Sequence, residues 1–222
     1  MKRLFLLLVL LSLFSSCKQD PWADLAREFC KDPDVGSLIF VKDVSGSTAV
    51  VEYYIRVSEG VAASDPEPFE GWTLAGNGSA FIGREGLGKT REGDAKTPVG
   101  CFKVVRAFGV LPDPGTSLDY LQVTPSIFAC DEEGPWYNKI IDTSAVHHAC
   151  KGEDMFHTAP EYNYGLELDY NSECVYPNGS AIFLHCKGSK QWTGGCIAID
   201  EDFLKKILVT AKPGIRVCIS GD

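Results

Sequence analysis

A histidine and a cysteine near the C-terminal end of the chain have the residue types and the spacing of a catalytic pair. His185 closes the apolar run Ile182–Leu184, and Cys196 follows the two glycines Gly194 and Gly195. A cysteine becomes a nucleophile when a neighbouring base takes its proton, and histidine most often serves as that base. The pattern therefore predicts an enzyme with a thiol nucleophile. A glycine turn beside a buried or disulfide-bonded cysteine is the alternative interpretation.

The elements around this pair must bring the two side chains together. In a strand over Ala181–His185, successive side chains point to opposite faces, so His185 and Cys186 cannot be partners. We expect Lys187–Trp192 to form a tight return that packs Cys196 against His185 in a hairpin-like arrangement. The two glycines allow positive φ and close backbone approach, which lets amide N–H groups near Cys196 face the oxyanion of a tetrahedral intermediate.

The rest of the chain is rich in strand patterns from Ser37 onward. Asp200 is a good N-cap for the one clear helix, whose apolar stripe ends before Pro213. Eight apolar or alternating runs are separated by Gly, Pro, Asn and Asp clusters. These runs are Ser37–Val41, Ala49–Val57, Ser79–Ile82, Cys101–Arg106, Tyr120–Val123, Gly165–Tyr170, Ala181–His185 and Gly214–Ile219. They predict a mainly β domain with a few short helices, built as a sandwich or a partly closed barrel.

The first residues predict export and a lipid anchor. Two basic residues precede the apolar run Leu4–Leu13, which is shorter than the roughly 20 residues needed to span a bilayer. Leu13–Cys17 resembles the lipobox of bacterial lipoproteins, which implies acylation of Cys17. An ordinary signal peptide with a coincidental cysteine is the alternative. Multiple acyl chains would hold the protein on a membrane, and Lys18 favours the outer membrane of a bacterial envelope, facing the periplasm.

Three segments follow from this organisation. Residues 1–16 are a lipoprotein signal peptide, residues 17–36 are an acylated N-terminus and tether with one or two helical turns, and residues 37–222 form a single domain.

Loss of residues 1–16 leaves 19 basic and 30 acidic residues and a formal charge of −11. Such a charge argues against nucleic acid as a partner, because phosphate binding needs a basic face.

The chain has nine cysteines, which suits an oxidising compartment better than a reduced cytosol. Setting aside Cys17 and Cys196 leaves seven, so at least one further thiol is free or pairs outside the chain. Cys130 with Cys150, or Cys150 with Cys174, would staple the long middle segment.

Several motifs together resemble the YkuD-type L,D-transpeptidase catalytic domains. The matching segments are Gly83–Lys89, Arg91–Gly100, Val123–Ser126, Trp136–Asn138, Tyr164–Leu166 and the motifs at His185 and Cys196. The similarity covers Leu38–Ile219. Members of this family are exported, largely β-structured enzymes that use cysteine to attack the bond after the third, diamino acid residue of peptidoglycan stem peptides. The resemblance implies the same fold, a peptidoglycan L,D-transpeptidase activity, and no cofactor or metal.

The resemblance also implies a role for each residue of the pair and its loop. Cys196 is the nucleophile and His185 is the base. The backbone around Thr193 and Gly194 orients the imidazole, and Gly195 with Cys196 lines the oxyanion hole.

Two departures from the family's usual pattern concern spacing and substrate anchoring. Only eight positions separate His185 from Thr193, and Ala198 stands where the family usually has Arg or Asn. Other side chains would then bind the substrate, for instance a stem-peptide carboxylate, and the candidates are Arg84, Lys89, Arg91, Tyr137 and Trp192.

The acceptor, the oligomeric state and two other classes of protein stay open. If a second stem peptide or another protein accepts the acyl group, the enzyme is a transpeptidase. If water does, it is an L,D-carboxypeptidase or a hydrolase of the peptidoglycan-lipoprotein link. A non-catalytic peptidoglycan-binding module on the same scaffold is a further alternative. So is a zinc hydrolase, whose candidate ligands are His147, His148, Cys150, His157, Cys174, His185 and Cys186.

Overall fold

The computed structural model describes residues 20–57 and 69–221. The predicted leader and the lipidation site Cys17 lie outside the described residues. In chain order the elements are α1 (Pro21–Cys30), β1 (Ser37–Ser45), β2 (Thr48–Arg56), β3 (Trp72–Phe81), β4 (Gly100–Gly109), β5 (Tyr120–Gln122), β6 (Ile127–Cys130), β7 (Lys139–Asp142), β8 (Glu153–Asp154), β9 (Gly165–Leu168), β10 (Phe183–Cys186), β11 (Ile197–Ile199), α2 (Glu201–Thr210) and β12 (Ile215–Ile219).

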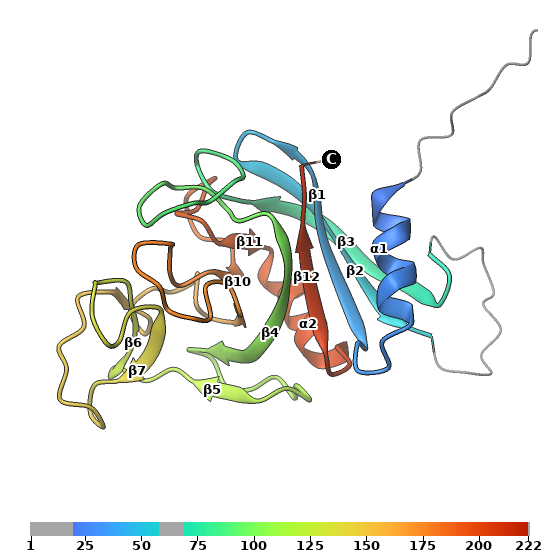
Figure 1. Cartoon of the computed structure of the whole chain (residues 1–222). Helices are drawn as coiled ribbons and strands as arrows, with labels where there is room; N and C mark the ends of the chain where they lie inside the picture. The colour runs from blue at the N-terminus through green and yellow to red at the C-terminus, as the bar shows by residue number, and fades with distance from the viewer. Residues whose placement is uncertain (1–19, 58–68, 222) are drawn as a thin grey trace, which may run out of the picture.

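One large sheet closes on itself and forms a barrel. Its strand order is β12-β1-β2-β3-β11-β10-β9-β4-β5, and an additional pairing between β12 and β4 joins the two sides (Figure 1). The disulfide Cys101–Cys218 lies at this closure, because the two residues are direct partners in the β4–β12 ladder. The predicted mainly β fold with a partly closed barrel is therefore confirmed.

The barrel core lies between the strands and α2. Ile39 and Val41 of β1 belong to the same apolar cluster as Leu204, Ile207 and Leu208 of the helix. The helix begins after Asp200, as predicted, although the Asp200 side chain makes no capping hydrogen bond. Because β1 alternates, its other residues face away from this core.

The opposite face of β1 is covered by α1. Leu38 and Phe40 pack there in a second cluster with Trp22, whose ring lies 4.8 Å from that of Phe40. Trp72 of β3 donates from its indole to the Ala26 carbonyl at 2.9 Å. Figure 1 shows α1 beside the strands. Residues 21–30, predicted as part of a tether with one or two helical turns, thus form a ten-residue helix that belongs to the folded body.

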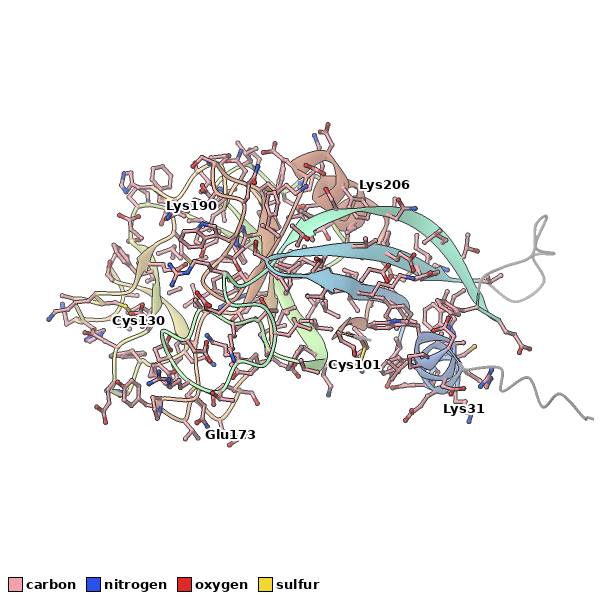
Figure 2. The ribbon with its side chains drawn as sticks, turned by 90° about the horizontal axis from the view of Figure 1, so that it is seen from above. Lys31, Cys101, Cys130, Glu173, Lys190 and Lys206 are labelled. Atoms are coloured by element: carbon pink, nitrogen blue, oxygen red, sulfur yellow. A yellow bond between two sulfur atoms is a disulfide. The ribbon has the colours of Figure 1, made fainter. Side chains whose placement is uncertain are left out.

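The segment between β5 and β9 adds a small sheet, in the order β7-β6-β8. The disulfide Cys130–Cys150 fastens it, so one of the two predicted staples is confirmed. Cys174 is a free cysteine, as are Cys30 and Cys186. Figure 2 shows Cys130 and Lys190 at the end of the molecule opposite Lys31. Of the helices in the described ranges, none is long and apolar enough to cross a membrane.

Candidate active site

The candidate pair lies on two neighbouring strands, β10 and β11, which run parallel. His185 is level with Ala198, and Cys196 directly precedes β11. The predicted hairpin-like return is therefore wrong, because a tight turn joins only antiparallel strands. The segment between β10 and β11 instead returns to the starting end of β10, so that both strands run in the same direction. The predicted alternation is confirmed, since Leu184 and Cys186 face the barrel core while Phe183 belongs to a separate apolar cluster with Cys196.

The returning loop is fixed by the segment that follows β3. The N–H of Thr193 donates to the Ile82 carbonyl at 2.8 Å, and the N–H of Arg84 donates to the Thr193 carbonyl at 3.0 Å. These two bonds form an isolated parallel β-bridge between Gly83 and Thr193. The position of Cys196 is thus set by Gly83 and its neighbours, which belong to the motif that resembles the family signature.

Two threonine hydroxyls hold the backbone at the cysteine. Thr193 Oγ1 donates to the Cys196 carbonyl at 2.7 Å and accepts from the Gly195 N–H at 3.1 Å. Thr97 Oγ1 is 3.3 Å from the same carbonyl. Gly195 has φ +153°, and a Cβ built on it would lie 2.9 Å from the Lys96 carbonyl oxygen. Only glycine fits this turn without strain.

The backbone N–H groups near the cysteine differ in whether they are free to donate a hydrogen bond to a substrate. The Gly195 N–H is occupied by Thr193 Oγ1, so the implied contribution of this group to an oxyanion hole does not fit the structure. In the residues described here, the N–H groups of Gly194 and Cys196 have no hydrogen-bond acceptor. These two donors are therefore the ones free to bind a developing negative charge.

The thiol of Cys196 is buried, with a residue exposure of 8%. Its Sγ donates to the Ala181 carbonyl at 3.1 Å and accepts from the Phe183 N–H at 3.3 Å, and neither bond involves His185. Burial raises the pKa of the thiol to about 12, and the Glu153 carboxylate adds to the rise, while the Phe183 N–H and Lys89 oppose it. The resting cysteine is therefore a neutral thiol.

The imidazole of His185 is fixed in one orientation. Nδ1 lies 2.8 Å from the Cys186 carbonyl, which can only accept, so Nδ1 carries the proton and Nε2 keeps its lone pair. Tyr162 packs edge-on against the ring at 5.5 Å. Burial lowers the pKa of His185, against smaller opposing effects of the Cys186 carbonyl and Glu161. The Cys186 carbonyl thus holds the imidazole, not the backbone around Thr193 and Gly194 as the resemblance implied.

Both side chains line one cavity of about 480 Å³. Four acidic residues share its wall: Glu92, Asp131, Glu153 and Glu161. The hydroxyl of Tyr162 donates to Glu153, whose pKa is raised by burial. Lys190, which Figure 2 shows at the end of the molecule opposite Lys31, also lines the cavity.

The predicted substrate-binding residues have different fates. Lys89 and Trp192 line the cavity. Tyr137 is 1% exposed and donates its hydroxyl to Glu92, so it lies behind the wall. Arg84 and Arg91 are exposed and do not belong to the cavity lining, although Arg84 stacks over the Trp192 ring at 5.3 Å.

Ala198 lines the cavity directly beside His185. A polar side chain at this position would face the cavity. Ala198 offers no polar side-chain atom there and leaves the thiol and imidazole in place.

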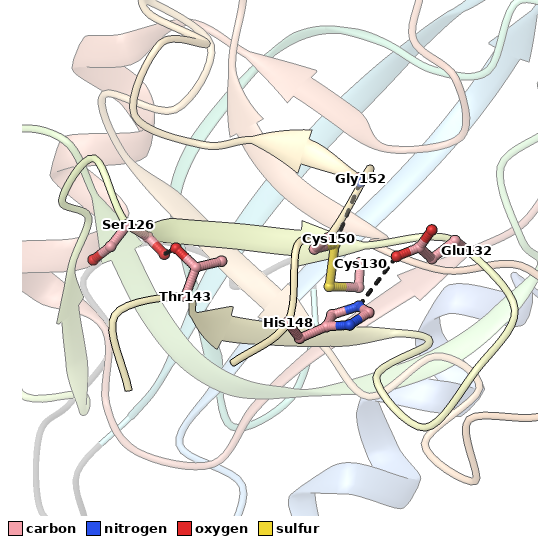
Figure 3. Close-up of a disulfide and its surroundings, with 7 residues drawn as sticks. All are labelled: Ser126, Cys130, Glu132, Thr143, His148, Cys150 and Gly152. Atoms are coloured by element: carbon pink, nitrogen blue, oxygen red, sulfur yellow. Dashed lines mark hydrogen bonds and ion pairs between the residues drawn. A yellow bond between two sulfur atoms is a disulfide. The ribbon is translucent and has the colours of Figure 1, made fainter. Parts of the chain in front are cut away.

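Of the residues considered for zinc, the structure brings His148 and Cys150 together, and it adds Cys130 to them. The described residues contain one group of histidine, cysteine and acidic ligand atoms close enough for a metal, made of Cys130, His148 and Cys150. Its two sulfur atoms form a disulfide, and His148 Nε2 lies 3.1 Å from Glu132 (Figure 3). His185 and Cys186 are not part of this group.

Sequence reasoning missed four contributors to the site. Thr97 lies in the quoted motif Arg91–Gly100, yet nothing in its type pointed to a bond with the Cys196 carbonyl. Tyr162, Glu153 and Glu161 lie in the middle segment, where no local motif marks them. Tyr162 and Glu161 precede β9, which pairs with β10, and Glu153 belongs to β8, which pairs with β6. Periodicity cannot show these long-range pairings.

A comparison with protein families completes the assignment of the class. The family model described as the L,D-transpeptidase catalytic domain, YkuD, matches residues 60–219. The chain therefore belongs to the L,D-transpeptidase catalytic domain family, whose activity is cysteine-dependent and directed at peptidoglycan. No curated protein matches the sequence.

Proposed function

We propose that the protein is a peptidoglycan L,D-transpeptidase in which Cys196 is the nucleophile and His185 is the general base. The observation that carries this proposal is their shared cavity. A cysteine held by a glycine turn and an imidazole with its Nε2 lone pair free line the same wall, in a chain of this family. This is the constellation that nucleophilic catalysis by a thiol requires.

The reaction begins with transfer of a proton from the thiol to Nε2 of His185. Because Sγ now donates to the Ala181 carbonyl, the thiol must turn from that carbonyl to the imidazole when substrate enters. Catalytic hydrogen bonds often form only in the substrate complex. The thiolate then attacks the carbonyl carbon of the diamino acid residue of a stem peptide.

The tetrahedral intermediate carries its negative charge on the former carbonyl oxygen. The free N–H groups of Cys196 and Gly194 are the donors for this oxyanion. When the intermediate collapses, the C–N bond breaks, the imidazolium of His185 gives its proton to the leaving nitrogen, and D-alanine departs. An acyl-enzyme thioester on Cys196 remains.

The second half of the reaction depends on the acceptor. An amine of a second stem peptide or of another protein yields a new amide bond, and water yields a shortened stem. We place this activity in a bacterial envelope, on the outer membrane, from the export leader and the lipidation motif at Cys17.

The test uses purified protein and muropeptides with tetrapeptide stems, followed by mass spectrometry. We expect release of D-alanine together with a cross-linked dimer as the product. A tripeptide product without dimer would identify a carboxypeptidase. The variant Cys196→Ala should release no D-alanine, and Cys174→Ala, which removes a free cysteine outside this cavity, should retain activity. Folded protein that binds peptidoglycan without turnover would contradict the enzyme assignment.

A further inference from the structure

A buried lysine lies against the cysteine loop. The Lys89 side chain is 2% exposed, and its Nζ would lie 3.2 Å from a Cβ built on Gly195. A Cβ on Gly179 would lie 2.5 Å from Cε of the same lysine. The lysine side chain thus runs close to two glycines, and its ammonium group lies next to the residue that precedes Cys196.

The ammonium group is held in this position by Asp94. Lys89 Nζ is 2.9 Å from Asp94 Oδ1, and the carboxylate also accepts the N–H groups of Thr90, Arg91 and Lys96 at 2.8 to 3.1 Å. Burial alone would raise the pKa of Asp94, but the Thr90 N–H, Lys89 and the other two N–H groups lower it to about 2. A carboxylate ionised throughout the working pH range therefore fixes the cation.

The position of this cation bears on the chemistry of the thiol. Burial raises the pKa of Cys196, and the Glu153 carboxylate raises it further, whereas Lys89 acts in the opposite direction. The other titratable groups close to the thiol are Tyr162, which packs in the same cluster, and His185, which lines the same cavity. Lys89 is the cation in this set whose place is fixed by an ion pair of buried partners.

We propose that Lys89 is an electrostatic partner of Cys196, and that its ammonium group, anchored by Asp94 beside Gly195, stabilises the negative charge that forms on the thiolate. The proposal rests on the proposed role of Cys196 as nucleophile. It also changes the role expected for Lys89 from the sequence. The ammonium group is buried and paired with Asp94, so it is not free to bind a stem-peptide carboxylate. It acts on the reacting sulfur instead.

The effect of a fixed cation on a buried thiol should be large. An opposite charge at close range favours the ionised form of a group, and the effect is strongest where water is excluded. Removing the positive charge while keeping a similar side-chain volume, as in Lys89→Met, should raise the apparent pKa of Cys196 by about one pH unit. Because the thiolate is the reactive form, alkylation near neutral pH should slow by roughly tenfold.

The experiment measures the rate of alkylation of Cys196 by iodoacetamide across neutral and alkaline pH, without any substrate. Peptide mass spectrometry separates Cys196 from the other thiols. Lys89→Arg, which keeps the charge, should follow the wild-type pH profile. The matched control is Lys42→Met, which removes a lysine from a partly buried ion pair with Glu52 between β1 and β2. It should leave the profile unchanged. Glu153→Gln should shift the profile toward lower pH.

Folded Lys89→Met protein with the wild-type alkylation profile would overturn the proposal. If thermal stability fell at the same time, the role of Lys89 would be purely structural. If Lys89→Met does not fold, the double variant Lys89→Met/Asp94→Asn, which leaves no unpaired buried charge, decides the question with the same expectation. Because alkylation needs no peptidoglycan, a failure of the proposed function would appear separately as absent muropeptide turnover.

Discussion

At the scale of single residues, the resting Cys196–His185 pair carries no charge. Burial keeps Cys196 protonated and His185 unprotonated, since it raises the pKa of the first and lowers that of the second. The free protein therefore contains no thiolate–imidazolium pair. In the proposed mechanism the proton moves to His185 when the substrate arrives, Lys89 stabilises the thiolate, and the free N–H groups of the cysteine loop bind the oxyanion.

The histidine makes a prediction for the pH dependence. A general base must be unprotonated, so activity falls as pH decreases through the pKa of His185. Burial lowers this pKa below its ordinary value of 6.5. The acid limb of the kcat/KM profile should therefore lie below pH 6.5. Glu161→Gln should move it lower still, because the Glu161 carboxylate raises the pKa of His185. An acid limb above pH 6.5 would contradict the assignment.

The two glycines before the cysteine make a matched pair for mutation. Gly195 has φ +153° and no room for a Cβ, whereas a Cβ on Gly194 would have nothing within 4 Å. Gly195→Ala should cost about 1–3 kcal/mol in strain, measured by chemical unfolding, and should lower kcat/KM by roughly a hundredfold through displacement of Cys196. Gly194→Ala should stay close to wild type in both. Equal effects of the two substitutions would contradict the described turn.

At the scale of elements, the local sequence pattern predicted most of the strands and missed those that are defined by pairing with neighbouring strands. Each of the eight predicted runs overlaps an observed strand, and α2 begins where Asp200 indicated. β6, β7, β8 and β11 were not predicted. They have two to four residues each and are defined by hydrogen bonds to neighbouring strands, which the local pattern does not show.

The same reasoning explains why the pair was predicted and its geometry was not. His185 and Cys196 stand out because their residue types and flanking glycines are local features. The parallel arrangement of β10 and β11 depends on β3, which pairs with β11 through Phe81 and Ala198. The proximity of Lys89 and Asp94 to Gly195 is likewise a result of tertiary packing.

The two disulfides make a prediction about the elements they join. Cys101–Cys218 spans 117 residues at the barrel closure, and Cys130–Cys150 spans 20 residues in the small sheet. By loop-closure entropy, the double variant Cys101→Ser/Cys218→Ser should lose about 5 kcal/mol of stability and Cys130→Ser/Cys150→Ser about 3 kcal/mol. Urea unfolding measures both. A larger loss from the second variant would show that the small sheet, not the closure, limits stability.

At the scale of the whole molecule, the chain is a closed barrel with α2 packed by one face against its core and α1 on its outside. The predicted domain start at residue 37 followed the strand pattern, which cannot show that α1 packs on β1. Trp22 and Ala26 are the residues that tie this helix to the body. The barrel places Cys196 and His185 in one cavity, which Lys190 also lines. Figure 2 shows Lys190 at the end of the molecule away from Lys31.

The proposed mechanism requires a covalent intermediate on Cys196. The most direct measurement is the intact mass of the protein quenched during reaction with a tetrapeptide muropeptide, followed by peptide mapping. We expect an added mass equal to the muropeptide minus D-alanine, located on Cys196, and no adduct on Cys196→Ala. Release of D-alanine at an undiminished rate by Cys196→Ala, or an adduct on another residue, would contradict it.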